Sequence, residues 1–213
     1  GAGSFGGIDA YRAGFVDEKG NIIPMDVITC LIAQDLLARD KGVIFYDLRS
    51  SWAVKEIIQE SGGTPMMSRV GHAFIKQQMR ENNAIFAGEL SGHYYFRSNY
   101  FTESSSTAAL CVANIVSQAT QPLSELMKPL RRYFASGEIN FHVDSPEAVL
   151  RRIKDKYRDG KLITLDGISV EYPDWWFNVR ASNTEPLVRL NLEAKSADLM
   201  EKKKAELMEQ IKA

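Results

Sequence analysis

Apolar residues repeat at helical spacing from Pro24 to about Arg39, and proline suits the first turn of a helix. Upstream, two short apolar segments flank the polar turn from Asp17 to Gly20 and predict a β-hairpin. Downstream, the predicted elements are a strand at 43–46, a helix at 52–60, a strand at 64–67, a helix at 72–80, a strand at 84–87, a loop at 88–103 and a helix at 105–116. Strands and helices that alternate with short links predict a three-layer α/β domain with a mostly parallel mixed sheet.

The pattern changes after a short helix between Pro122 and Pro129, where Ala135-Ser136-Gly137 has the composition of a linker. The elements expected beyond it are an extended segment at 138–143, a helix capped by Ser145 that runs to Tyr157, strands at 162–172, 175–179 and 187–193, and a helix at 197–212. This order predicts a smaller α+β domain, a four-stranded antiparallel sheet with two helices. Trp175-Trp176-Phe177 is expected to lie in its core rather than to form an exposed aromatic platform.

These patterns place the two domains at residues 5–134 and 135–213. Residues 1–4, Gly-Ala-Gly-Ser, have the small, polar composition of a leader added for expression, so they are left out of the fold prediction. A chain of 213 residues, 45% of them hydrophobic, is long enough for two small domains that each bury a core.

Charge and cysteine content narrow the classes of function. A formal net charge of -1 excludes a strongly basic surface, so we expect no general affinity for nucleic acid or for anionic membranes. Cys30 and Cys111 lie in apolar helical stretches without metal-ligand spacing, which indicates reduced thiols. No apolar stretch approaches the roughly 18 residues of a membrane span, and we expect a cytoplasmic protein.

The segment from Arg180 to Pro186 concentrates groups that bind phosphate. It contains Arg180, Ser182, Asn183 and Thr184 between two predicted strands, and Arg189 follows in the second strand. An arginine fork binds two phosphate oxygens at once, and hydroxyl and amide groups add neutral donors. The same residues are also ordinary turn formers, so a polar hairpin loop is the alternative.

A second segment, Ala87 to His93, leaves a buried strand and carries Glu89 and Ser91 two residues apart. A carboxylate and a hydroxyl on the same side of an extended loop can hold adjacent sugar hydroxyls. The alternative is a connecting loop bracketed by glycines, in which Glu89 is merely solvated.

Three further polar residues follow the other predicted parallel strands. Arg49 comes after the first strand of the βαβ series, and Arg69 and His72 come after the second. Loops at the carboxyl ends of parallel strands meet at one edge of the sheet, where cations suit a phosphorylated ligand and a histidine can shuttle protons. A histidine at the start of a helix is more often a structural residue.

Three motifs together carry a family resemblance. Gly71-His72-Ala73-Phe74-Ile75-Lys76, Gly88-Glu89-Leu90-Ser91-Gly92-His93 and Arg180-Ala181-Ser182-Asn183-Thr184-Glu185-Pro186 resemble the α-D-phosphohexomutases, in the phosphomannomutase/phosphoglucomutase branch. The resemblance runs from about Phe5 onward and matches the carboxyl-terminal half of that four-domain family, its third and fourth domains. It implies 1- and 6-phosphates of a hexose, glucose or mannose, as ligands, without a choice between the two sugars, and a missing amino-terminal half as the partner.

The resemblance also implies residue roles. It implies that Glu89 and Ser91 bind sugar hydroxyls, that Arg49 and Arg69 contribute to substrate binding, and that His72 and Arg12 are catalytic. The residues that it implies for the non-reacting phosphate are Arg180, Ser182, Asn183, Thr184 and Arg189. The family's phosphoserine belongs to its first domain, so the resemblance implies that this chain lacks the nucleophile.

The segment Gly7-Ile8-Asp9-Ala10-Tyr11-Arg12 stands where the family has an Asp-Gly-Asp-x-Asp-Arg loop for Mg²⁺. Asp9 is the one carboxylate left in this degenerate remnant, and Mg²⁺ prefers several hard oxygen ligands in octahedral geometry. We therefore expect no cofactor bound by this chain and no turnover by the chain alone. The alternative function is a non-catalytic two-domain module that binds phosphosugars or other anions.

Overall fold

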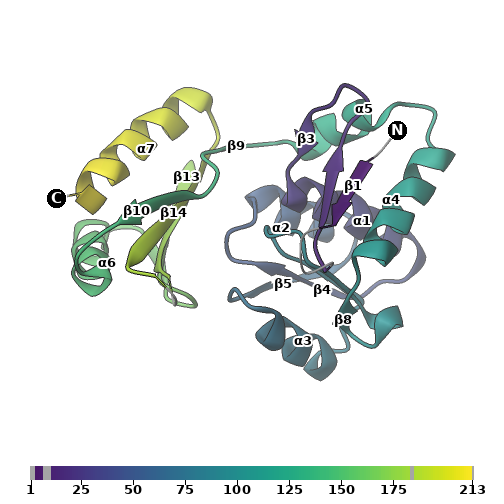
Figure 1. Ribbon diagram of the computed structural model, residues 1–213, viewed down its shortest axis with the longest axis horizontal. Helices are drawn as coiled ribbons and strands as arrows, with labels where there is room; N and C mark the ends of the chain where they lie inside the picture. The colour runs from purple at the N-terminus through teal and green to yellow at the C-terminus, as the bar shows by residue number, and fades with distance from the viewer. Residues whose placement is uncertain (1–2, 7–10, 183–184, 213) are drawn as a thin grey trace. The chain divides into compact units, whose positions relative to one another are not determined.

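The computed structural model describes residues 3–6, 11–182 and 185–212. The chain divides into two compact units, Gly1–Arg131 and Arg132–Ala213, each with its own sheet and helices (Figure 1). No helix among the described residues is long and apolar enough to cross a membrane.

The central sheet of the first unit has the strand order β5-β4-β6-β7-β8. Its strands are β4 (Val43–Asp47), β5 (Thr64–Ser68), β6 (Phe86–Gly88), β7 (Tyr94–Phe96) and β8 (Thr102–Glu103). Strand β4 is parallel to β5 and β6, whereas β6, β7 and β8 are antiparallel. The mixed sheet is therefore confirmed, but the region predicted as one loop at 88–103 contains two strands. Strands of two or three residues are too short to show a period of two in the sequence.

Helices cover both faces of this sheet, as the three-layer prediction requires. Helices α1 (Met25–Arg39), α2 (Trp52–Glu60) and α4 (Ser105–Gln118) lie on one face, and α3 (His72–Glu81) lies on the other. The strands supply both faces because their side chains alternate: Phe45, Ala87 and Tyr95 pack against α3. On the α1 side, the Tyr94 hydroxyl donates to the Met25 carbonyl oxygen at 3.1 Å.

A smaller antiparallel sheet of three strands, β1 (Gly3–Gly6), β2 (Ala13–Val16) and β3 (Ile22–Ile23), precedes α1. The predicted hairpin corresponds to β2 and β3 and is confirmed. Gly3 and Ser4, expected to belong to a leader, lie in β1 and pair with β2. The first unit ends with α5 (Leu123–Met127) and a 3₁₀ turn, Lys128–Leu130.

The second unit is an antiparallel sheet with the order β10-β14-β13-β12-β11, with β9 also paired to β14. Its elements are β9 (Phe134–Ala135), β10 (Ile139–His142), α6 (Pro146–Lys156), β11 (Lys161–Ile163), β12 (Ile168–Glu171), β13 (Trp175–Ala181), β14 (Leu187–Ala194) and α7 (Ala197–Lys212). The α+β class and both helices are confirmed, and the Ser145 side chain accepts from the Ala148 amide as the predicted cap.

The sheet has more strands than the four predicted, because the apolar stretch at 162–172 forms a hairpin of β11 and β12. Gly167 allows this turn: its φ is +70°, and a Cβ there would lie 2.4 Å from the Val179 carbonyl oxygen. Ala135, expected in the linker, pairs with Glu193 in β14 instead.

The two faces of this sheet differ in chemistry. Phe177, Val179 and Leu190 face α6 and α7 in the apolar core, whereas Asn178 and Arg180 lie on the opposite face. Trp175 and Phe177 lie in the core as predicted, whereas Trp176 is buried on the opposite face, where its Nε1 donates to Glu193 at 3.0 Å. Polar side chains at alternate positions of β13 and β14 therefore share one face of the second unit.

Gly88 permits close packing of β6 on α1, and this predicts the effect of a substitution. A Cβ at position 88 would lie 2.2 Å from the Thr29 Oγ1 atom. We expect Gly88→Ala to lower the free energy of unfolding by about 1–3 kcal/mol through overpacking, measured by urea denaturation. The control is Gly14→Ala, where the nearest atom would be the Met25 Cε at 3.9 Å. Equal effects of the two substitutions would contradict this packing argument.

Candidate functional site

Glu89 follows β6 and is almost completely buried, with 2% of its surface exposed. One carboxylate oxygen accepts a hydrogen bond from the Gly71 amide at 3.2 Å, and the other accepts from the Tyr95 hydroxyl at 2.7 Å. Gly71 immediately precedes α3, so this carboxylate joins the loop after β6 to the loop after β5. The structure thus places Glu89 at the predicted edge of the sheet, in a bonded rather than a solvated state.

The partner hydroxyl is held in its protonated form. Burial, and then the negative charge of Glu89, raises the pKa of Tyr95. Because the phenol keeps its proton, Tyr95 donates this hydrogen bond and the Glu89 carboxylate accepts it. This contact fixes the orientation of Glu89.

Ser91 and His93 continue this network. The Ser91 Oγ lies 2.9 Å from the His93 Nδ1, and the same ring nitrogen lies 3.5 Å from a Glu89 carboxylate oxygen. Residue His93 also forms an antiparallel bridge with Arg12. His93 lies within the Gly88–His93 motif but was not predicted to have a role, because its contact with Ser91 depends on the hairpin of β6 and β7.

Asp47 and Arg49 form a buried ion pair at the end of β4. The Arg49 Nε and Nη2 atoms donate to the two oxygens of Asp47 at 3.1 and 2.7 Å. The same carboxylate accepts from the Leu90 amide at 2.7 Å. Asp47 was not predicted to be a site residue, yet it connects Arg49 to the loop that carries Glu89.

The start of α3 carries the remaining predicted residues of the first unit. His72 is the first residue of α3 and is exposed. The Arg69 guanidinium lies 4.1 Å from the centre of the Phe74 ring, and the buried Arg69 Nε has no hydrogen-bond partner among the described residues. Burial alone would raise the pKa of Glu103, but Lys76, at 3.1 Å, and the charge of His72 lower it.

The first unit therefore groups six predicted residues through shared loops and contacts. They are Arg12, Arg49, Arg69, His72, Glu89 and Ser91. Asp9, the expected remnant of the metal loop, lies outside the described residues.

In the second unit, Arg180 and Arg189 lie directly opposite each other on β13 and β14. Glu138 contacts both: its carboxylate lies 3.1 Å from an Arg180 Nη atom and 3.5 Å from an Arg189 Nη atom. The backbone of Ser182 closes the adjoining turn, with its amide donating to the Leu187 carbonyl oxygen at 2.8 Å. Asn183 and Thr184 lie outside the described residues. Glu138 was not predicted, because its partners are more than 40 residues away in the sequence.

The part of the chain that the structure describes holds no candidate metal site. Within ranges 11–182 and 185–212, no three His, Cys, Asp or Glu side chains converge as metal ligands. The segment at 7–12 supplies one carboxylate, Asp9, whereas Mg²⁺ needs several oxygen ligands.

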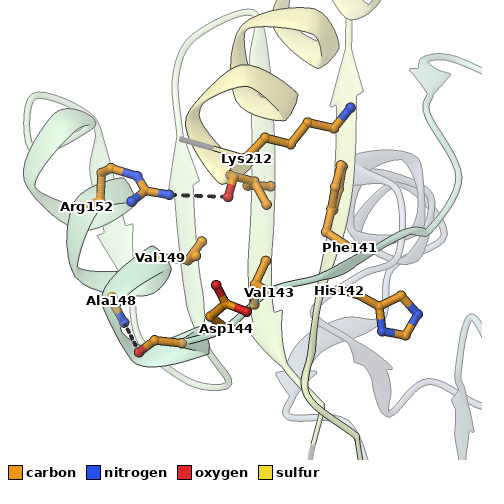
Figure 2. A pocket seen from close by; sticks show the side chains of 10 residues that line it. Phe141, His142, Val143, Asp144, Ala148, Val149, Arg152 and Lys212 are labelled. Atoms are coloured by element: carbon orange, nitrogen blue, oxygen red, sulfur yellow. Dashed lines mark hydrogen bonds between the residues drawn. The ribbon is translucent and has the colours of Figure 1, made fainter.

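A cavity of about 370 Å³ lies elsewhere in the second unit, between β10, α6 and the end of α7. Figure 2 shows Arg152 reaching across to the last turn of α7, where it donates to the Ile211 carbonyl oxygen at 3.2 Å. Its lining includes the apolar Phe141 and Val149 and the acidic Asp144. None of the predicted site residues lines this cavity.

Family models match most of the chain. Residues 24–133 match phosphoglucomutase/phosphomannomutase alpha/beta/alpha domain III, and residues 138–210 match the C-terminal domain of the same family. The chain therefore belongs to the phosphoglucomutase/phosphomannomutase family, of which it contains the third and last domains.

Individual relatives agree with this assignment. The chain is 45% identical over 200 residues to a phosphomannomutase of Methanocaldococcus jannaschii, and 39% identical over 204 residues to the phosphohexose mutases of Xanthomonas campestris. These matches cover 93% of this chain but 44% and 46% of the relatives, so the chain spans about half their length. A phosphoglucomutase/phosphomannomutase family protein from Burkholderia thailandensis superposes with a TM-score of 0.82 at 30% identity, over 94% of this chain and 44% of that one.

The buried pair of Asp47 and Arg49 predicts a large loss of stability when its charge is removed. Asp47→Asn removes the carboxylate charge that lies 2.7 Å from the buried Arg49 guanidinium, and we expect a loss of about 3–5 kcal/mol in the free energy of unfolding, measured by chemical denaturation. Asp35→Asn is the matched control, because Asp35 pairs with Arg39 on the exposed surface of α1 and should cost about 0.5 kcal/mol or less. A small effect at Asp47 would show that the pair does not hold the loops.

Proposed function

We propose that this chain is the hexose phosphate-binding half of a phosphoglucomutase/phosphomannomutase. In this proposal Arg180, Arg189, Ser182, Asn183 and Thr184 bind a phosphate group. The observation that carries it is the pair of opposed arginines. Like charges directly opposite on adjacent strands are unfavourable unless an anion lies between them.

The free donors of this pair support a phosphate ligand. The Nε atoms of Arg180 and Arg189 are both buried, and neither has a hydrogen-bond partner among the described residues. A buried N–H group without a partner is costly, so a ligand oxygen that accepts from it gains more than it would at an exposed site. Phosphate oxygens match the planar arginine fork in geometry and charge.

In the first unit, Glu89 and Ser91 are proposed to bind sugar hydroxyls, and Arg49 and Arg69 to contribute to substrate binding. Glu89 accepts two hydrogen bonds from protein groups, and a carboxylate offers about four acceptor positions, so it retains capacity for hydroxyls. The orientation imposed by Tyr95 reduces the cost of ordering this side chain when a sugar binds.

The catalytic candidates are His72 and Arg12, and His93 joins them. The His93 Nδ1 lies 2.9 Å from the Ser91 hydroxyl and 3.5 Å from the Glu89 carboxylate, and imidazole is a common general acid or base in catalysis.

We infer that these residues do not catalyse phosphoryl transfer alone. Transfer requires a phosphorylated nucleophile aligned with the acceptor hydroxyl, together with stabilisation of the developing charge. The resemblance assigns the phosphoserine to the family's first domain, and a single carboxylate in the 7–12 segment is a poor ligand set for Mg²⁺. We therefore propose that Mg²⁺ and the nucleophile come from an amino-terminal half such as the longer relatives have.

Calorimetry with glucose 1-phosphate and mannose 1-phosphate tests the binding role. We expect weak binding by the chain, reduced at least about tenfold by Arg180→Ala and by Glu89→Ala, because each removes a charge-assisted contact. Arg151→Ala and Glu81→Ala are controls, since both residues are exposed on helices and should leave binding unchanged. Thermal melts verify that each variant is folded. Binding that survives both site substitutions would contradict the proposed roles.

Adding the amino-terminal half of the Methanocaldococcus jannaschii phosphomannomutase in trans tests the catalytic assignment. We expect no mutase activity from this chain alone, and measurable conversion of mannose 1-phosphate to mannose 6-phosphate after the two halves associate. Association without activity would favour the alternative, a non-catalytic phosphosugar-binding module. Turnover by the chain alone would show that the inference about the nucleophile is wrong.

A further inference from the structure

Glu138 is the one acidic side chain that the described part of the second unit pairs with both Arg180 and Arg189. It immediately precedes β10, whose first residue, Ile139, pairs with Leu190 of β14. This register brings Glu138 beside Asn191, whose side-chain amide donates to the same carboxylate at 3.4 Å.

The arginine pair needs an anion even when no ligand is bound. Arg180 is 8% exposed, so its charge is largely removed from water, and Arg189 faces it across the two strands. A buried charge without a counter-charge is strongly destabilising. Glu138 supplies this counter-charge from the residue that immediately precedes β10, with 26% of its side chain exposed.

Glu138 uses only some of the hydrogen-bond donors of the two arginines. It contacts a terminal nitrogen of each guanidinium, while both buried Nε atoms remain without partners among the described residues. The carboxylate thus neutralises the pair without using all of its donors. A phosphate group that accepts from the Nε atoms would lie close to the Glu138 carboxylate, and the two anions would repel each other.

We propose that Glu138 is a built-in counter-anion: it holds Arg180 and Arg189 together in the free protein and weakens the binding of a phosphate group by competing for the same charges. This inference rests on the proposed phosphate-binding function and adds to it a residue that sets the affinity of the site. Glu138 is a positioning residue in the free protein and an electrostatic competitor in the complex.

The test is Glu138→Gln, which keeps the shape of the side chain and removes its charge. We expect the melting temperature of the free variant to fall, because the arginines lose their counter-charge. We expect its affinity for inorganic phosphate, measured by calorimetry at low salt, to rise about tenfold, because the repulsion is removed. The gain should shrink as salt is raised, since screening weakens interactions between partly exposed charges.

Glu206→Gln is the matched control. Glu206 also pairs with a cation in this unit, Lys203 at 2.8 Å, and its side chain is 31% exposed, but it lies on α7, which packs on the apolar face of the sheet. This variant changes the net charge equally and should leave phosphate affinity unchanged. A merely structural role for Glu138 would lower the melting temperature without raising the affinity.

A measurement on the unmodified chain keeps the proposal testable if the variant folds poorly. Phosphate should shift the Nε–Hε resonances of Arg180 and Arg189 in a two-dimensional NMR spectrum, and unshifted resonances on saturation with phosphate would overturn the inference. If the unmodified chain binds phosphate and Glu138→Gln binds it equally well or more weakly, the inference about Glu138 is wrong, but the proposed phosphate-binding function stands. Absence of phosphate binding in both proteins would overturn the proposed function itself.

Discussion

The candidate site of the first unit depends on the hydrogen bonds that the buried Asp47 carboxylate accepts. It pairs with Arg49 in its own loop and accepts from the Leu90 amide in the loop after β6. Glu89 repeats this arrangement one loop further, by accepting from the Gly71 amide at the start of α3. Because a buried carboxylate must be fully hydrogen-bonded to be tolerated, these contacts fix the three loops relative to one another.

In the second unit the buried charges that must be balanced are positive. Arg180 and Arg189 come from strands that pair directly, and the two helices that the structure describes in this unit, α6 and α7, pack on the opposite, apolar face. Glu138 offsets part of it, and the remaining donors are those that an anionic ligand can use. In both units buried charged groups are balanced by an opposite charge: Arg49 lies two residues from Asp47, whereas Glu138 lies 42 and 51 residues from Arg180 and Arg189.

Most elements were predictable from the sequence because their signals are local. The apolar period of α1, the Ser145 cap of α6 and the alternation of β13 each depend on neighbouring residues alone. The strands β7 and β8 were missed because two or three residues show no period. The hairpin of β11 and β12 was read as one strand, because the turn at Gly167 depends on contacts with β13.

The sequence by itself determined the α/β and α+β classes and the family, because element patterns and motif spacing are written along the chain. The roles of the six residues that the first unit groups stay predictions. Only the tertiary structure decided that Glu89 is bonded by Tyr95, that His93 lies beside Ser91, and that Glu138 balances two arginines. These contacts depend on strand register and hairpin geometry. Partners separated by as many as 51 residues, as Glu138 and Arg189 are, leave no local trace in the sequence.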